Sequence, residues 1–197
     1  MALNPIKPED ILSPSAYEKV RRERVAEIIK VKERRRVEVG PWMSFAFENR
    51  ATAVYQVQEM VRIERITDPT ALAHEIETFA DLLPGEGELS ATLFIEITDE
   101  ALRRKAMLEL GGIEKTVELQ IGEQNVPAFD KRPIDPRWER PGQATAVYYL
   151  GFKLSADQRR AFAGQSGEVW IRTNHPKYRH AAALSAEQRT ELAADWH

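Results

Sequence analysis

The sequence predicts an α+β fold in which an antiparallel or mixed sheet is covered by N-terminal helices. Helical periodicity and proline-led helix starts dominate residues 1–84, whereas alternating apolar segments typical of strands dominate residues 85–197. Strands and helices do not alternate strictly along the chain, which disfavours a doubly wound parallel sheet. A chain of 197 residues can bury most of its apolar surface in one core. We therefore expect a single α+β domain over residues 1–197.

The first long helix is expected to run from about Pro14 to Arg36. Ser13 can cap its first turn, and proline is well suited to the first helical position because it has no N–H to satisfy. Its apolar side chains share one arc at 100° per residue: Tyr17, Val20, Ile28 and Val31. Gly40-Pro41 then separates two short strands, residues 37–39 and 43–48, which can pair as a hairpin.

Two more helices are expected in the first half of the chain. One runs from about Ala51 to Ile66, and the next follows Asp68-Pro69, a cap and first-turn proline, to about Leu83. The second of these is amphipathic, with apolar side chains repeating at +4, +3 and +4: Leu72, Ile76, Phe79 and Leu83. The Pro84-to-Gly87 segment ends it.

The second half is expected to consist mostly of antiparallel strands. Apolar alternation indicates strands at residues 89–97, 116–121, 126–129, 144–154 and 167–173. Thr98 is expected to cap a helix that continues to about Leu110. The segments 154–159 and 184–189 read LSADQR and LSAEQR, and each is a capping box in which serine and glutamine satisfy first-turn N–H groups. The second box predicts a helix from about Ser185 to Trp196.

Composition removes several classes of chemistry. The chain has no cysteine, which excludes disulfides, thiolate metal sites and a cysteine nucleophile. No apolar run approaches the roughly 20 residues that span a bilayer, and residues 1–10 lack the apolar core of a signal peptide, so a cytoplasmic protein is expected. Glycine-rich phosphate loops and a serine nucleophile elbow are also missing from the sequence, and no cofactor is expected.

Charge is distributed in two blocks of opposite sign. Residues 17–36 hold nine basic and four acidic side chains, a net +5, whereas residues 67–88 hold six acids and no Lys or Arg. One interpretation is a basic face for an anionic partner, including nucleic acid bound by the helix from Lys19 to Arg36. The other is a pair of helices that partly neutralise each other within the fold.

A polar strip follows the second strand and extends along the helix after it. Glu48, Asn49 and Arg50 stand where strand meets helix, so their side chains are expected to project together. Burying such groups is costly unless they pair and form hydrogen bonds. The strip is therefore either a ligand site in a cleft or a structural lock, that is, a paired network that only holds the helix against the sheet. Glu59 is the candidate catalytic base. The ligand-binding candidates are Glu48, Asn49, Arg50, Thr52, Tyr55, Gln56 and Arg62.

The sequence offers two further sets of candidate residues, one for partner binding and one for metal ligation. The loop from Asp130 to Gly142 sets Trp138 among arginines, a composition typical of interface anchors, although Trp138 can equally fill a core. The candidates for partner binding are Arg34, Arg35, Arg36, Arg137 and Trp138. His175 and His180 are weak candidates for metal ligation, because their spacing matches no metal motif and no metal is expected.

A resemblance adds to these interpretations. The residues that carry it are Arg34-Arg35-Arg36, Val39-Gly40, Phe47-Glu48-Asn49-Arg50, Thr52, Gln56, Glu59-Met60, Arg62 and Glu64. With them, residues 17–66 resemble the N-terminal half of the uncharacterised bacterial family called domain of unknown function 3501, and the overall length agrees. The resemblance implies that no activity is established. It also implies a genomic setting beside a rubrerythrin-like protein and a heterodisulfide-reductase-like iron–sulfur protein.

Three functional hypotheses follow. The first is a non-catalytic partner or accessory protein in a redox or oxidative-stress setting, because the chain lacks cysteine and a cofactor loop of its own. The second is an enzyme or small-ligand binder that uses the polar strip from Glu48 to Arg62. The third is nucleic-acid binding through the basic helix, which four interleaved acids weaken. The sequence leaves open whether the protein is an enzyme.

Overall fold

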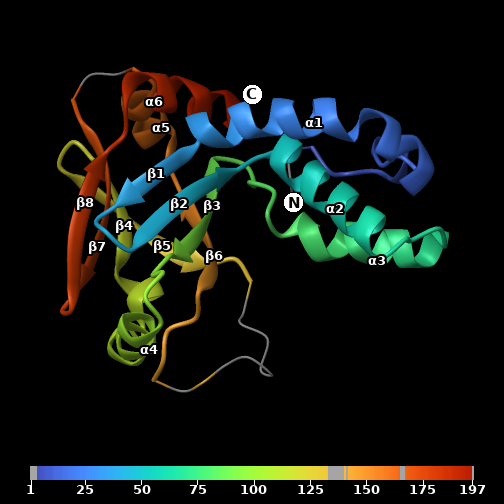
Figure 1. The fold of residues 1–197 in the computed structure, drawn as a ribbon. Helices are drawn as coiled ribbons and strands as arrows, with labels where there is room; N and C mark the ends of the chain where they lie inside the picture. The colour runs from blue at the N-terminus through green and yellow to red at the C-terminus, as the bar shows by residue number, and fades with distance from the viewer. Residues whose placement is uncertain (1–3, 133–139, 141, 165–166, 197) are drawn as a thin grey trace.

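The structure, a computed structural model, describes residues 4–132, 140, 142–164 and 167–196. Its strands form one antiparallel sheet in the order β1-β2-β3-β6-β5-β4-β7-β8, rolled into a nearly closed barrel (Figure 1). The strands are β1 (Arg36–Val39), β2 (Met43–Glu48), β3 (Glu88–Ile95), β4 (Val117–Ile121), β5 (Gln124–Asp130), β6 (Val147–Lys153), β7 (Val169–His175) and β8 (Tyr178–Ala183). The predicted α+β class is confirmed.

The two edge strands, β1 and β8, lie beside each other and nearly close the barrel. The hydroxyl of Tyr178 on β8 donates to the carbonyl oxygen of Val39 at 2.7 Å and accepts from the Trp42 N–H at 3.0 Å. The rings of Trp42 and Tyr178 stack with centroids 5.3 Å apart. Because an unpaired strand edge is open to pairing with other chains, this contact protects both edges.

Alternation along the strands separates a packed interior from a polar outer face. On β2, Phe45 and Phe47 point inward and are at most 1% exposed, and the register pairs Phe45 with Leu93 of β3. The barrel is therefore filled by side chains and is not a pore. The outward positions of β2 and β3 include Glu48 and Thr92, which contact each other on the outer face.

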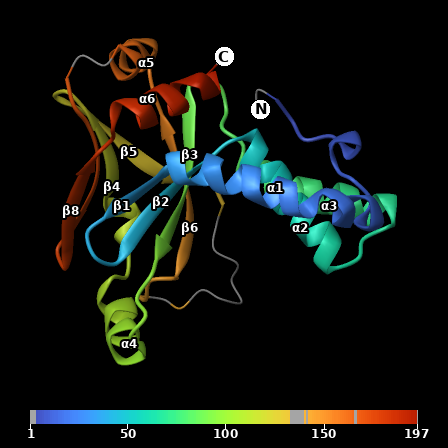
Figure 2. The same cartoon turned by 45° about the horizontal axis from the view of Figure 1, so that its top comes forward.

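Helices α1 (Pro14–Arg34), α2 (Arg50–Ile63) and α3 (Pro69–Ala80) form a lobe beside the barrel, as Figures 1 and 2 show. The lobe has its own apolar cluster: Ile6, Ala53, Val57, Val61, Ile76, Leu82 and Leu83. The expectation that these helices cover the sheet is therefore not confirmed. The apolar arc of α2 is buried against α3 and the N-terminal segment, so little of it remains to pack on strands.

The other helices lie at the two ends of the barrel. Helix α4 (Glu100–Glu109) lies at one end, and α5 (Ala156–Ala163) and α6 (Ala186–Ala193) lie at the other (Figure 2). Phe162 of α5 and Leu192 of α6 are fully buried in the barrel core. Strands β1 and β2 come from the helix-rich part of the chain, so residues 1–84 and 85–197 contribute to the same sheet.

Several predicted boundaries need correction. Helix α1 ends at Arg34, because Arg36 already pairs with Ala46 as the first residue of β1. Helix α4 is capped by Asp99 and not by Thr98, since the Asp99 carboxylate accepts from the Leu102 N–H at 2.7 Å. The sequence does not predict strand β8, because its residues resemble a histidine-containing loop followed by alanines.

Both predicted capping boxes, at Ser155 and Ser185, are present. In each box the serine hydroxyl accepts from a glutamine N–H and the glutamine side chain accepts from the serine N–H. Within the described ranges, every helix is too short or too polar to cross a lipid bilayer.

Candidate functional site

A cleft of about 280 Å³ lies between the helical lobe and the outer face of β2, β3 and β6. We call it the Glu48 cleft and define it by Lys32, Arg36, Glu48, Gln56, Thr92 and Tyr149, which line it together with neighbouring residues. Its walls come from the end of α1, the first turns of α2 and four strands, since Arg36 belongs to β1. The cleft therefore exists only because the lobe stands against the barrel.

Glu48 is one of the few charged side chains that are buried among the described residues, with 4% of its surface exposed. Thr52 Oγ1 donates to Glu48 Oε2 at 2.5 Å, and Thr92 Oγ1 donates to Glu48 Oε1 at 2.6 Å. Within the described part of the chain, no Lys, Arg or His forms an ion pair with it. Two hydroxyls thus hold both carboxylate oxygens without a neutralising cation.

The local sequence explains why Glu48 lies there. Glu48 ends β2, and Asn49 caps α2 by accepting from the Thr52 N–H at 3.0 Å. In return, Thr52 Oγ1 accepts from the Asn49 N–H at 2.9 Å, which turns the threonine toward the strand end. A carboxylate near the first turn of a helix is favoured by the free N–H groups and the helix dipole.

Arg35 fixes the backbone beneath the cleft. It is 1% exposed, and its Nε and Nη2 donate to the carbonyl oxygens of Phe47 and Glu48 at 2.9 and 3.3 Å. The same guanidinium forms ion pairs with Asp195 and with Glu191. Burial raises the pKa of Asp195 above its usual value, and the positive charge of Arg35 opposes that rise.

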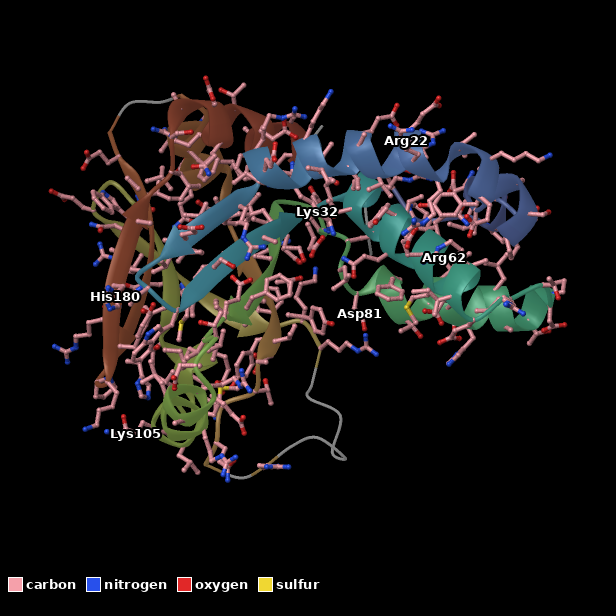
Figure 3. All side chains as sticks on the ribbon, in the orientation of Figure 1. Arg22, Lys32, Arg62, Asp81, Lys105 and His180 are labelled. Atoms are coloured by element: carbon pink, nitrogen blue, oxygen red, sulfur yellow. The ribbon has the colours of Figure 1, made fainter. Side chains whose placement is uncertain are left out.

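The rim of the cleft carries cations of two kinds. Arg36 is already neutralised by Glu96, 2.5 Å away, and its guanidinium lies over Phe94. Lys32 lies 5.1 Å from the centroid of the Tyr55 ring and has no carboxylate within ion-pair distance among the described residues. Figure 3 shows Lys32 where α1 approaches the barrel. Lys32 is thus the cation of the rim that can meet an anionic ligand.

Neutral hydrogen-bonding groups complete the cleft. The Gln56 side chain is half-buried and forms no hydrogen bond to another residue of the described ranges. Tyr149 is half-buried, and Arg132 lies over its ring at 5.8 Å. Together with Glu48 and Lys32, these groups can offer a small polar molecule an acceptor, a cation, an amide and a phenol.

The predicted polar strip is divided by the turn of α2. Glu48, Thr52 and Gln56 meet in the Glu48 cleft, whereas Arg50 and Tyr55 line a different cavity on the side of α1. The expectation that Glu48, Asn49 and Arg50 project together does not match the structure. Their side chains bond respectively to threonines, to the first turn of α2 and to Asp10.

Glu59 belongs to a third group, an ion-pair cluster that joins α1 to α2. Arg21 donates to both of its carboxylate oxygens, at 2.9 and 3.0 Å, and Arg62 donates at 3.0 Å. The Tyr17 hydroxyl donates at 2.8 Å. These bonds, led by that from Arg21, lower the pKa of Glu59 to about 2 although burial opposes them. A carboxylate held so firmly ionised is a weak base, which favours the structural-lock interpretation.

Burial and a neighbouring anion raise the pKa values of the two phenols near this cluster. The pKa of Tyr17 is raised by burial and by its hydrogen bond to Glu59, and that of Tyr55 is raised by burial. Both phenols therefore stay neutral at physiological pH. They act as hydrogen-bond donors and ring surfaces, not as bases.

The arginines proposed for partner binding are engaged within the molecule. Arg34 pairs with Glu191 at 3.2 Å, Arg35 is buried, and Arg36 pairs with Glu96. Arg137 and Trp138 lie outside the described residues, so their role stays a prediction.

The other basic side chains of α1 are partly neutralised as well. Arg21 is bound to Glu59 and Arg24 to Glu27, whereas Arg22 lies on the side of α1 away from α2 (Figure 3). Neutralisation of this kind weakens the field that nucleic-acid binding requires.

The histidines named as weak metal candidates lie on neighbouring strands. His175 is 8% exposed, and its Nδ1 accepts from the Lys177 N–H at 3.2 Å. The His180 ring lies against Tyr178, with centroids 4.3 Å apart, on the far side of the barrel from the lobe (Figure 3). Across the residues that the structure describes, His, Asp and Glu side chains form no group of three that could hold a metal.

Sequence reasoning missed Lys32, Thr92 and Tyr149 as members of the site. Thr92 carries a signal, because it is a polar residue inside the apolar run LSATLFIEI and on the same strand face as Ser90. Lys32 and Tyr149 carry none, since their contribution depends on how the lobe stands against the barrel.

Comparisons with known proteins place the chain among uncharacterised relatives. A family model described as "Protein of unknown function (DUF3501)" matches residues 5–196. A crystal structure of a novel protein of unknown function from Burkholderia pseudomallei K96243 is 32% identical, with a TM-score of 0.89. The match covers 98% of this chain and 100% of that chain. No curated protein matches.

Proposed function

The chain belongs to the DUF3501 family of proteins of unknown function, and we propose that it binds a small polar ligand in the Glu48 cleft. The observation that carries the proposal is the Glu48 carboxylate, buried at the cleft, held by Thr52 and Thr92 and not neutralised by a cation of the described residues. The proposal concerns binding, and it includes no reaction.

A buried carboxylate of this kind is poorly explained by stability. Removing a carboxylate from water costs on the order of several kcal/mol, and only close cations and good hydrogen bonds offset that cost. Replacing buried charges by apolar residues is often neutral or stabilising. Two threonine hydroxyls satisfy Glu48 in part, and each oxygen keeps further acceptor capacity. A donor group of a ligand would supply the missing interaction.

The surrounding side chains define the chemistry of that ligand. Glu48 requires an N–H or O–H donor, best a cationic one, whereas Lys32 requires an anionic group. Gln56 and Tyr149 add neutral hydrogen bonds and a ring surface. A small zwitterion of the amino-acid type meets these requirements. The cleft volume of about 280 Å³ lies near the lower end of ligand-pocket volumes, which also favours a small molecule.

The accessory role beside a rubrerythrin-like and an iron–sulfur protein stays a prediction. It rests on the family resemblance alone, and the three of its four proposed arginines that the structure describes, Arg34, Arg35 and Arg36, already have carboxylate partners within the chain. The same holds for nucleic-acid binding through α1. No contact among the described residues favours either role over the Glu48 cleft.

Ligand-observed NMR with the full chain tests the proposal. The probes are the common amino acids, each compared with the amine that lacks its carboxylate and with the acid that lacks its amino group. We expect at least one amino acid to bind. Both of its truncated forms should bind at least about tenfold more weakly, because each loses one charge-assisted contact. Absence of binding across the panel, or equal binding of the truncated forms, would overturn the proposal.

A matched pair of lysines on α1 provides the control. Lys32→Gln removes the cation of the cleft, and Lys30→Gln removes an exposed lysine two residues away that does not line it. We expect weaker binding only for the first variant. Equal effects of the two would mean that general charge, and not the cleft, attracts the ligand.

A further inference from the structure

A second cavity, of about 390 Å³, lies between α1, α2 and the N-terminal segment. We propose that it binds an amphipathic carboxylic acid, with the apolar body on the helices and the carboxylate at Arg50. This site lies on the other side of α2 from Thr52 and Gln56, and the inference does not depend on the Glu48 cleft. Its size falls in the usual range of small-ligand sites.

The N-terminal segment, residues 4–13, forms one wall and is fixed in place. The Gln58 side chain accepts from the Leu12 N–H at 2.8 Å and donates to the Leu12 carbonyl oxygen at 2.9 Å. Ile6 is 6% exposed in the apolar cluster of the lobe. Because the backbone is held at both places, the cavity is preformed, and a ligand would not have to order this wall.

The surface of the cavity is mainly apolar. Ile28 and Val31 of α1 face Val54 of α2 across it, and Leu12 closes it while remaining 39% exposed. Two of the polar side chains here are already engaged: Gln58 holds Leu12, and the Tyr17 hydroxyl donates to Glu59. Such a bed selects for an aliphatic or aromatic body and offers it few hydrogen bonds.

Arg50 supplies the polar end. Its Nη2 forms an ion pair with Asp10, and its Nε is buried without an acceptor within the described ranges. A guanidinium carries five N–H donors, so one carboxylate leaves most of them unused. With one third of the side chain exposed, Arg50 can turn its remaining donors toward a second carboxylate. Arg24 and Glu27, also at the cavity, already pair with each other.

Titration calorimetry with the full chain and decanoate tests this inference. We expect saturable binding of decanoate. Decanol and decylamine, which keep the alkyl chain but lack the negative charge, should bind at least about tenfold more weakly. Failure of decanoate to bind, or binding of all three with equal affinity, would overturn it.

Two pairs of variants separate the site from general effects on the fold. Val31→Trp fills the cavity and should abolish decanoate binding, whereas Ile29→Trp, at a position on α1 that does not line the cavity, should leave it unchanged. Arg50→Gln should weaken binding about tenfold or more. Asp10→Asn breaks the same ion pair but keeps the guanidinium, so it should preserve or strengthen binding. Equal losses for the two members of either pair would contradict the site.

Discussion

Asp195 and Arg35 form a buried ion pair between residues that are 160 positions apart in the chain. The side chains are 9% and 1% exposed. Because Arg35 also donates to the carbonyl oxygens of Phe47 and Glu48, Asp195 stabilises the end of β2 and with it one wall of the Glu48 cleft. The C-terminal segment therefore contributes to the site without lining the cleft.

Replacing Asp195 tests this coupling. Asp195→Ala leaves the Arg35 guanidinium buried with only the more exposed Glu191 as counter-ion, and we expect a loss of about 3 kcal/mol in the free energy of unfolding. Chemical denaturation measures it. Glu9→Ala, which removes an exposed ion pair with Lys7, is the control and should change stability by less than about 0.5 kcal/mol. Equal effects would refute a structural role for the buried pair.

The Glu59 cluster predicts a pH dependence. The pKa of Glu59 is about 2 in the folded protein and near 4.5 when the group is free, so its contribution to stability is complete above pH 4.5. That contribution is lost as pH falls from 4.5 toward 2. We expect Glu59→Gln to destabilise the fold by about 1–3 kcal/mol at pH 7 and to approach the wild type in acid. Denaturation at a series of pH values measures the difference.

The exposed pair of Arg24 and Glu27 gives the matched comparison for that series. Glu27→Gln removes a carboxylate whose side chain is 67% exposed, and it should change stability little at any pH. A penalty for Glu59→Gln that stayed constant from pH 7 to pH 3 would show that the carboxylate charge does not stabilise the cluster.

Closure of the barrel depends on Gly40. Its φ is +67°, and a Cβ there would lie 2.5 Å from His180 Cγ and 2.6 Å from the Tyr178 hydroxyl. Gly40→Ala is expected to cost about 2 kcal/mol or more, from backbone strain and from displacement of the ring that joins β8 to β1. Gly122, with φ +58° and open space around it, isolates the strain alone, so Gly122→Ala should cost about 1 kcal/mol. Equal losses in thermal unfolding would argue against the contact.

Local chemistry made much of the fold predictable. Ser13, Asp68, Ser155 and Ser185 each cap the helix that their sequence predicts, because an N-cap depends on neighbours three residues away. Strands with strong apolar alternation are predictable because that pattern, too, is local in the sequence. The lobe beside the barrel was not predictable, because it depends on whether α2 packs on α3 or on strands.

The site was predictable only in part. The sequence marked Glu48, Thr52 and Gln56, which do share a cleft, but it grouped them with Glu59, whose partner Arg21 comes from another helix. A polar residue on α2 contacts the barrel, the N-terminal segment or α1 according to its angle around the helix. Lys32 reaches the cleft from α1 and Tyr149 from β6, and no local sequence pattern predicts either contact.

The central claim is that Glu48 is kept for a ligand and not for the fold. The most direct measurement is the affinity of the tightest-binding amino acid for the wild type and for Glu48→Gln, with thermal unfolding of both recorded in parallel. Glu118→Gln, on the outer face of β4, is the control. We predict at least about tenfold weaker binding for Glu48→Gln, with unfolding within a few degrees of the wild type, and unchanged affinity for the control. Unchanged affinity of Glu48→Gln, or a large loss of its stability, would contradict the account.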